Sequence, residues 1–307
     1  SKDGEFVDIN TLLRYNKKDE PVYKIHMSNI DRPTNYTQEH PLYLSETINN
    51  EFNFIEVKHA KIGMWTKYPN FYNKIKNVPL ELWDKYKTKR KFNTINPMNN
   101  EDFWWFVGHW LGDGFNNKQG NNYTIYNSFG LKETEYVLKY KDIVTRLFSR
   151  HPCLKLQNGS NTYKFEYKQL YLFLEDNFGK YANGKYISEW VKFLPINLKN
   201  HLILGYMDSD GSVYKDRGMI RSTFKSINRR LLNDIQDILF SIGIVSSFNL
   251  SDKPYIYNIN GKHGETKQSY ALRLNQIELK KFADKFDFNC NSRKLELAKQ
   301  IEFKQKP

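Results

Sequence analysis

HLILGYMDSDGSV (residues 201–213) and WFVGHWLGDGFNN (residues 105–117) share a pattern that decides the fold of this chain. Each stretch is an apolar run that ends in an acid followed by glycine, at Asp210 and at Asp113. The two acids stand roughly one hundred residues apart, which is long enough for a small domain with its own core. The pattern therefore predicts an internal repeat, which is a feature to seek before any other.

Small residues recur on one face of both predicted helices, at an i, i+4 spacing. Glycine has no Cβ, so two such stripes let two helix backbones approach closely. We expect the helices to pack on each other through Gly108, Gly112, Gly205 and Ser209. This packing would bring Asp113 and Asp210 side by side, and Gly114 and Gly211 would end the helices with a positive φ.

The rest of the chain predicts an α+β fold. Helix, strand, helix, strand and helix patterns occur twice, in residues 96–195 and in residues 196–307. Asn99 or Asn100 is a candidate N-cap for the first motif helix. Residues 1–95 are β-rich, with short runs such as PVYKIHM, and they end in a basic linker.

Composition favours a polyanionic partner. The 307 residues are 39% hydrophobic and 26% charged, and they carry a net charge of +13 with a pI of about 9.4. Nucleic acid is the commonest partner of so basic a chain, although plain surface charge remains an alternative. No run approaches the ~20 apolar residues of a membrane span. Cys153 and Cys290 lack metal-ligand spacing, and an intracellular location is expected.

The paired acids predict metal-dependent chemistry. Two carboxylates at helix C-termini face the unfavourable end of each dipole and repel each other. A divalent cation compensates for both effects, and Mg²⁺ prefers a few carboxylates together with phosphate oxygens. Asp113 and Asp210, with Gly112 and Ser209 before them, are the candidate metal ligands, and phosphodiester hydrolysis follows. A helix stop before a turn explains one such motif, but two at repeat spacing favour catalysis.

FVGHWLGDG (106–114) and ILGYMDSDG (203–211) resemble the two signature helices of the LAGLIDADG homing endonucleases. The second copy is close, whereas the first has His109 inside the helix and Leu111 where the second has Asp208. The resemblance covers about residues 100–307. Because Asp208 has no counterpart in the first copy, we expect it to support the structure and not to carry the chemistry.

The resemblance implies a pseudo-twofold pair of αββαββα units in one monomeric chain, whose strands form a saddle over a long, specific double-stranded DNA site. The last acid of each motif, Asp113 or Asp210, would bind the catalytic metal. That metal would be Mg²⁺, with Mn²⁺ as a substitute, and Ca²⁺ is expected to bind without supporting cleavage. Both strands would be hydrolysed across the minor groove, leaving short 3′ overhangs.

The resemblance also implies a basic residue near the active site in each half. Lys185 in FGKYANGKYI and Lys294 in FDFNCNSRKLEL match those places, where a lysine could stabilise developing phosphorane charge. DNA contacts are expected from the strands after each motif. The candidates are Lys215, Arg217, Arg221 and Lys225 in the second half, and Asn121, Asn122, Tyr123, Tyr126 and Asn127 in the first. Ordinary exposed lysines and sheet residues remain the alternative for each of them.

NYTQEHPLYLSE contains Thr37-x-x-His40 and is followed by FIEVKHAKIGMWTKYP. Together these resemble part of an intein splicing (Hint) domain. No opening catalytic Cys or Ser block and no closing His-Asn pair are visible, so this chain is not expected to splice by itself. The region could be a remnant, half of a split system or a DNA-binding platform.

Three other functions stay open beside the homing nuclease. An intron RNA maturase can share the fold, protein splicing would use the N-terminal region, and a transcription factor would need no paired acids. The intact acids favour the nuclease over each of these.

Overall fold

The computed structural model describes residues 20–67, 72, 77–87, 96–157, 160–259, 262–286 and 292–302. Contacts divide the chain into two units, residues 1–71 and residues 72–307. The predicted hairpin turn at Asn158 and Gly159, and the cysteine Cys290, lie outside the described residues. No helix within the described ranges is both long and apolar enough to cross a membrane.

The described part of the first unit is built from short strands, as the sequence predicts. It contains a two-stranded sheet and a three-stranded sheet in the order β4-β3-β5. The strands are β1 (Val22–Ile25), β2 (Thr34–Thr37), β3 (Pro41–Ser45), β4 (Asn53–Glu56) and β5 (Trp65–Thr66), with a 3-10 turn η1 (Val57–His59).

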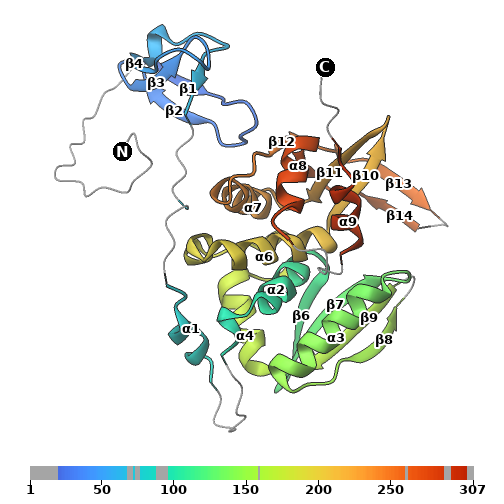
Figure 1. Cartoon of the computed structure of the whole chain (residues 1–307). Coiled ribbons are helices and arrows are strands. Elements are labelled where there is room, and N and C mark those ends of the chain that lie inside the picture. The colour runs from blue at the N-terminus through green and yellow to red at the C-terminus, as the bar shows by residue number, and fades with distance from the viewer. Residues whose placement is uncertain are drawn as a thin grey trace. The chain divides into compact units, whose positions relative to one another are not determined.

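The second unit is an α+β structure with two four-stranded antiparallel sheets, ordered β6-β7-β9-β8 and β10-β11-β15-β12 (Figure 1). Its first part contains α1 (Leu80–Asp84), η3 (Pro97–Asn99), α2 (Glu101–Asp113), β6 (Gly114–Gln119), β7 (Asn122–Gly130), α3 (Thr134–Phe148), β8 (Cys153–Gln157), β9 (Ser160–Glu166), α4 (Lys168–Phe178), α5 (Tyr181–Gly184) and η4 (Glu189–Phe193).

The second part repeats the order of the first. It contains α6 (Ile196–Asp208), β10 (Gly211–Asp216), β11 (Met219–Ser226), α7 (Arg229–Ser241), β12 (Ser247–Leu250), β13 (Ile256–Ile259), β14 (Lys262–Glu265), β15 (Tyr270–Leu274), α8 (Gln276–Ala283) and α9 (Arg293–Lys299). The β13–β14 hairpin forms a sheet of its own between β12 and β15.

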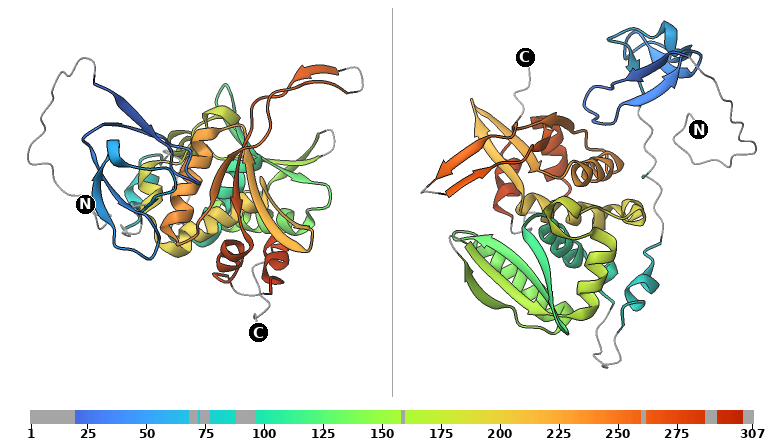
Figure 2. Two further views of the ribbon diagram at one scale, coloured as in Figure 1. Left: turned by 90° about the horizontal axis from the view of Figure 1, so that it is seen from above. Right: turned by 180° about the vertical axis from the view of Figure 1, so that it is seen from behind.

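Helices α2 and α6 lie side by side at the centre of the second unit, between the two sheets. Figure 2 shows that the strands of both sheets extend on the same side of this helix pair. Helix α2 runs directly into β6, and α6 is followed after the two turn residues Ser209 and Asp210 by β10. The C-terminal ends of both helices therefore lie where the sheets begin.

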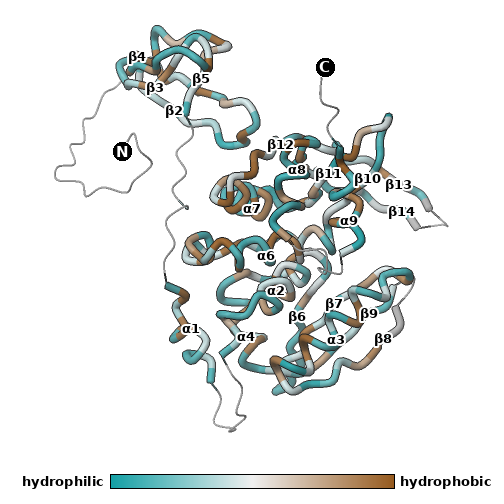
Figure 3. Tube along the Cα trace, in the orientation of Figure 1, coloured by the Kyte–Doolittle hydropathy of each residue, from teal (hydrophilic) through white to brown (hydrophobic). Residues whose placement is uncertain are grey.

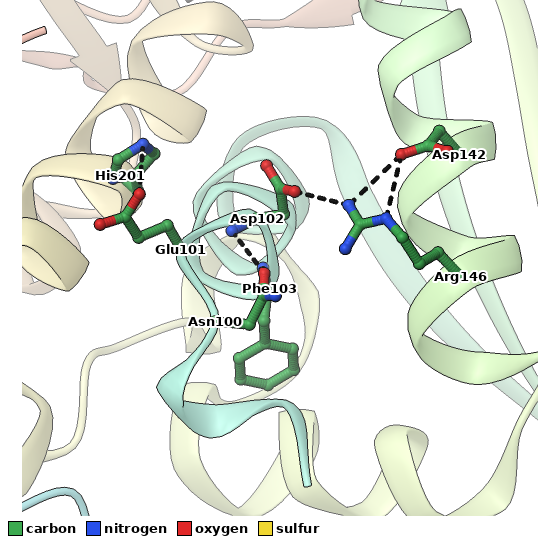
Figure 4. A network of polar contacts seen from close by, with 7 residues as sticks. All are labelled: Asn100, Glu101, Asp102, Phe103, Asp142, Arg146 and His201. Atoms are coloured by element: carbon green, nitrogen blue, oxygen red, sulfur yellow. Dashed lines mark hydrogen bonds and ion pairs between the residues drawn. The ribbon is translucent and has the colours of Figure 1, made fainter. Parts of the chain in front are cut away.

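The N-terminal end of α2 is fixed by a cap and by two neighbouring helices (Figure 4). The Asn100 side chain accepts hydrogen bonds from the first backbone N–H groups of the helix, including that of Asp102 at 2.9 Å. This cap confirms one of the two candidates from the sequence. Arg146 of α3 pairs with Asp102 at 2.5 Å, and His201 of α6 lies 3.6 Å from Glu101.

The core of the first half is aromatic, and it includes a helix that precedes the repeat. Trp83 of α1 is 1% exposed, and its ring packs against Phe103 at 5.7 Å and Phe173 at 5.3 Å. Residues 77–87 thus pack in the second unit, although the sequence placed them in the N-terminal region that ends at residue 95. Figure 3 shows the mixed hydropathy of α1 and of α7, as expected for helices with one buried face.

The prediction that Gly114 and Gly211 end their helices with positive φ is wrong. Gly114 has φ −97° and ψ 159°, and Gly211 is not among the residues with positive φ. The chain leaves α2 directly in extended conformation and leaves α6 through the turn residues Ser209 and Asp210, neither of which has a positive φ, so no left-handed residue is needed. Glycine is required there by space, because a Cβ on either residue would lie 2.6 Å from a carbonyl oxygen, that of Trp110 or Met207.

Candidate functional site

Helices α2 and α6 touch through the small-residue stripes that the sequence predicts. A Cβ on Gly108 would lie 2.0 Å from the Leu202 carbonyl oxygen, and one on Gly205 would lie 2.0 Å from the Trp105 carbonyl oxygen. At the C-terminal end, a Cβ on Gly112 would lie 2.1 Å from Ser209 Oγ. The backbones are therefore in contact along the whole stripe, which only residues without a Cβ, or with a small one, allow.

This packing brings Asp113 and Asp210 together, because each follows directly on a residue at the closest contact of the helix ends. Burial and the nearby charge of Asp210 raise the pKa of Asp113 to about 7. Burial also raises the pKa of Asp210. Two desolvated carboxyl groups of like charge form an electrostatically costly pair, and a positive ion placed between them would relieve it.

Replacing Asp113 with asparagine is expected to stabilise the metal-free protein at alkaline pH. The folded-state pKa of about 7 exceeds the ordinary value of 3.8, so the stability that protonation confers is lost as pH rises through 7. Removing the ionisable group should raise the free energy of unfolding by up to about 4 kcal/mol at pH 8.5, and by less at pH 5.5. Urea unfolding at both pH values measures this difference.

Added Mg²⁺ is expected to stabilise the wild type but not Asp113→Asn in the same unfolding experiments. An equal effect of Mg²⁺ on both proteins would contradict metal binding at Asp113. An equal gain in stability at both pH values would contradict the raised pKa.

The two predicted lysines occupy matching positions at the ends of the central helices. Lys185 Nζ donates to the carbonyl oxygens of Trp110 (2.8 Å), Leu111 (3.0 Å) and Gly114 (2.7 Å). Lys294 Nζ donates to those of Met207 (2.8 Å), Asp208 (2.8 Å) and Ser209 (3.2 Å). Each ammonium group thus uses all three of its donors. Lys185 caps the C-terminal end of α2, and Lys294 caps the C-terminal end of α6.

Each lysine also acts on the paired acids, and it acts most strongly on the acid of the other helix. Lys294 contributes more than Lys185 to lowering the pKa of Asp113, whereas Lys185 contributes more to lowering that of Asp210. Burial lowers the pKa of Lys185 to about 8, and burial also lowers that of Lys294.

Asp208 lies inside the protein and not at the paired acids. It is fully buried, and its Oδ2 accepts from Trp105 Nε1 at 2.8 Å while its Oδ1 accepts from Ser292 Oγ at 2.5 Å. These contacts agree with a supporting role for Asp208. His109, the other departure between the two motifs, is also fully buried, and burial lowers its pKa to about 3.

In the second sheet, Arg221 and Lys225 lie on the face that the helices leave open. They alternate on β11 with Ile220, Ser222 and Phe224, which are buried. Arg221 is opposite Tyr214, and it lies 3.5 Å from Asp216. Lys225 pairs with Asp252. Lys215 is opposite Ile220 and therefore lies on the other face, while Arg217 has φ 48° in the exposed β10–β11 turn.

In the first sheet, Tyr126 lies on the side away from the helices but is only 8% exposed there, because it stacks on Phe115 with ring centroids 4.4 Å apart. Asn122 shares this face, and Asn121 lies in the exposed β6–β7 turn.

The placement of Asn127 differs from the sequence prediction. It is fully buried beside His109, with Asn127 Nδ2 3.1 Å from His109 Nδ1, because it alternates with Tyr126 and faces the helices. Tyr123 is likewise on the helix side, with its ring against Tyr171 at 5.1 Å.

Three basic residues of the open faces were missed in the sequence because they lie on later strands. Lys164 of β9 is opposite Tyr126, and Lys155 of β8 has its ammonium 5.7 Å from the Tyr126 ring centroid. Arg273 of β15 is opposite Thr223 in the second sheet. Alternation of charged and apolar residues in these strands was the available signal, but strand order had to be known before it could be used.

No three His, Cys, Asp or Glu side chains gather as a possible metal site within the described ranges. The Asp113–Asp210 pair fits a hard cation that takes its remaining ligands from substrate and water. Ser209 is a weaker candidate ligand, because its carbonyl oxygen already accepts from the Lys294 ammonium.

In the first unit, the His40 ring stacks on Tyr36 at 4.6 Å and Thr37 pairs with Val22, and no Hint-like role follows from these contacts.

The sequence of the second half matches a known family model. Residues 197–287, which include nearly all of α6 and the second sheet, match the model of the LAGLIDADG-like domain.

Two curated relatives come from Methanocaldococcus jannaschii. The ATP-dependent DNA helicase Hel308 is 30% identical over 114 residues, which are 36% of this chain and 9% of that protein. The DNA-directed RNA polymerase subunit Rpo1C is 32% identical over 125 residues, which are 41% of this chain and 13% of that protein. The chain thus matches only a small part of either relative.

Solved structures similar to this chain include the homing endonuclease I-DmoI in complex with DNA and Mn, at a TM-score of 0.45 and 14% identity, over 60% of this chain and 94% of that one. Mesophilic variants of I-DmoI give a TM-score of 0.44 at 14% identity, over 60% and 93% of the two chains. Full-length DUF199/WhiA from Thermatoga maritima gives 0.42 at 12% identity, over 72% and 64%.

Proposed function

We propose that this protein is a site-specific DNA endonuclease that hydrolyses both strands of a duplex in a metal-dependent reaction. The observation that carries the proposal is the pair of half-buried acids, Asp113 and Asp210, at the touching ends of α2 and α6. A helix end that needs only a stop gains nothing from two desolvated carboxyl groups of like charge. The proposal includes a pseudo-twofold pair of αββαββα units in which each acid serves one strand.

The open faces of the two sheets are the proposed DNA surface. Their strands extend on one side of the α2–α6 pair, and the paired acids lie where those strands begin (Figure 2). Basic side chains lie on both faces: Arg221, Lys225 and Arg273 on one, and Lys155 and Lys164 on the other. Such residues bind phosphates and base edges, and the net charge of +13 favours approach to a polyanion.

The residues of the site divide the work of hydrolysis. Asp113 and Asp210 would hold Mg²⁺, which activates water and stabilises the leaving oxygen when it is bound. Lys185 and Lys294 place positive charge beside the acids, which favours the ionised carboxylates and stabilises the negative charge that develops at the scissile phosphate. Because their donors are used by backbone carbonyls, we assign the lysines an electrostatic role and not proton transfer.

Cleavage of a randomised duplex library tests this proposal. The purified chain is incubated with the library and Mg²⁺, Mn²⁺ or Ca²⁺, and cut ends are sequenced. We expect defined double-strand cuts with short 3′ overhangs in Mg²⁺ and Mn²⁺, and binding without cutting in Ca²⁺. Binding of a specific duplex without cutting in any of these ions would overturn the nuclease proposal.

The intron RNA maturase is the alternative that such a result would favour, since it uses the fold without cleavage. The paired acids are the feature that disfavours it, because RNA binding does not require them. The Hint-like region at residues 1–95 stays a prediction from Thr37 and His40, and the nuclease proposal does not depend on it.

A further inference from the structure

The segment that carries Lys294 is fixed by a buried hydrogen-bond chain that ends on the other half of the molecule. Ser292 is the N-cap of α9, and its Oγ accepts from Leu295 N at 3.3 Å while it donates to Asp208. Asp208 in turn accepts from Trp105 Nε1, and Trp105 belongs to α2 of the first half. Ser292, Asp208 and Trp105 are each at most 1% exposed.

The segment that carries Lys185 lies in the first half and is held by hydrogen bonds to the second half. Asn228, the N-cap of α7 in the second half, donates through Nδ2 to the carbonyl oxygens of Lys185 at 2.7 Å and Ala182 at 3.0 Å. On the next turn of α7, Asp234 Oδ2 accepts from Ile187 N at 3.0 Å. Both α7 side chains are buried, and the first half offers no acid at the position of Asp208, where Leu111 stands.

We propose that Asp208 and Asn228 are positioning residues, each of which holds one lysine at the paired acids by tying the segment that carries it to the opposite half. This proposal rests on the nuclease function proposed above. A lysine side chain is long and flexible, so the place of its ammonium depends on the backbone that carries it. A displacement of about 1 Å in an active site can cost about 100-fold in rate.

The two anchors differ in chemistry, and this difference predicts two different effects. Losing Asp208 should displace Lys294 alone, and losing the Asn228 amide should displace Lys185 alone. Because the two lysines cap different helix ends, each loss should slow the cleavage of one strand more than that of the other. A general loss of stability would instead slow both strands together.

The test compares Asp208→Leu, which copies Leu111 of the first half, with Asn228→Ser, which keeps an N-cap oxygen but removes the amide donor. The full chain is used with a cleavable duplex from the library, with each strand carrying its own label. Asp208→Asn is the conservative variant, and it is used if Asp208→Leu fails to fold. Lys294→Met and Lys185→Met give the reference pattern for each lysine, and thermal unfolding monitors the fold.

We expect Asp208→Leu to slow one strand at least tenfold more than the other, in the pattern of Lys294→Met. Asn228→Ser should give the opposite bias, in the pattern of Lys185→Met, and Asp208→Asn should show a smaller bias than Asp208→Leu. Equal slowing of both strands by folded variants, or the same bias in both, would overturn the positioning proposal while the nuclease proposal stands. A wild type that cuts neither strand would overturn the nuclease proposal itself.

Discussion

Asp113→Asn and Asp210→Asn are each expected to abolish double-strand cleavage and to leave an enzyme that nicks. Each acid would serve one strand, so a single variant should lose at least about 10²–10³-fold in rate on that strand, the scale of losing one preorganised electrostatic contact at a transition state. The double variant should cut neither strand. The measurement is single-turnover cleavage of a duplex with both strands labelled, in Mg²⁺ at pH 7.5, which lies between the pKa of Asp113 at about 7 and that of Lys185 at about 8.

Asp142→Asn is the matched control for these variants. Asp142 is an exposed acid on α3 that pairs with Arg146 at 3.3 Å, so its loss should change neither strand. DNA binding in Ca²⁺ should be retained by all the variants, which separates loss of chemistry from loss of binding. Double-strand cleavage by either single variant at the wild-type rate would show that the acid concerned is structural.

Gly108→Ala and Gly205→Ala are expected to lower stability more than ordinary core substitutions. Each added Cβ would lie 2.0 Å from a backbone carbonyl oxygen of the facing helix, and a backbone cannot rotate away as a side chain does. Overpacking usually costs about 1–3 kcal/mol, and we expect each change to cost about 2–4 kcal/mol because whole helices must separate. Urea unfolding measures the loss, and Mg²⁺-dependent cleavage should fall as the paired acids move apart.

Gly184→Ala is the control for these substitutions. A Cβ on Gly184 would meet nothing within 4 Å, and its φ is not positive, so the change should be neutral or stabilising by up to about 1 kcal/mol. If Gly108→Ala were as mild as Gly184→Ala, the close contact of α2 and α6 would be contradicted.

The sequence was most informative where a local pattern occurred twice. The stripe of Gly108, Gly112, Gly205 and Ser209 predicted the helix contact, because a missing Cβ has the same steric consequence in any fold. The cap at Asn100 also follows from local chemistry. The same local argument failed at Gly114, where a strand follows the helix at once and no left-handed turn is made.

Only the tertiary structure showed which face of each strand the helices cover and which distant residues are hydrogen-bonded to one another. Alternation along a strand divides residues into two sets but does not say which set the helices cover, and so Asn127 was grouped with Tyr126 although the two lie on opposite faces. The roles of Asn228 and Ser292 were likewise invisible, because their partners Lys185 and Asp208 are 43 and 84 residues away.

By itself, the amino-acid sequence determined that this protein has two halves with a repeated order of helices and strands, two close-packed helices and two acids at their ends. These features follow from residue size and spacing, which act over a few neighbouring positions. Only the tertiary structure decided that Lys185 and Lys294 cap the helices beside those acids, and that the segment of each lysine is hydrogen-bonded to the opposite half, directly by Asn228 or by way of Asp208 and Trp105. Such contacts depend on how distant segments come together, since desolvation and charge act through space and not along the chain.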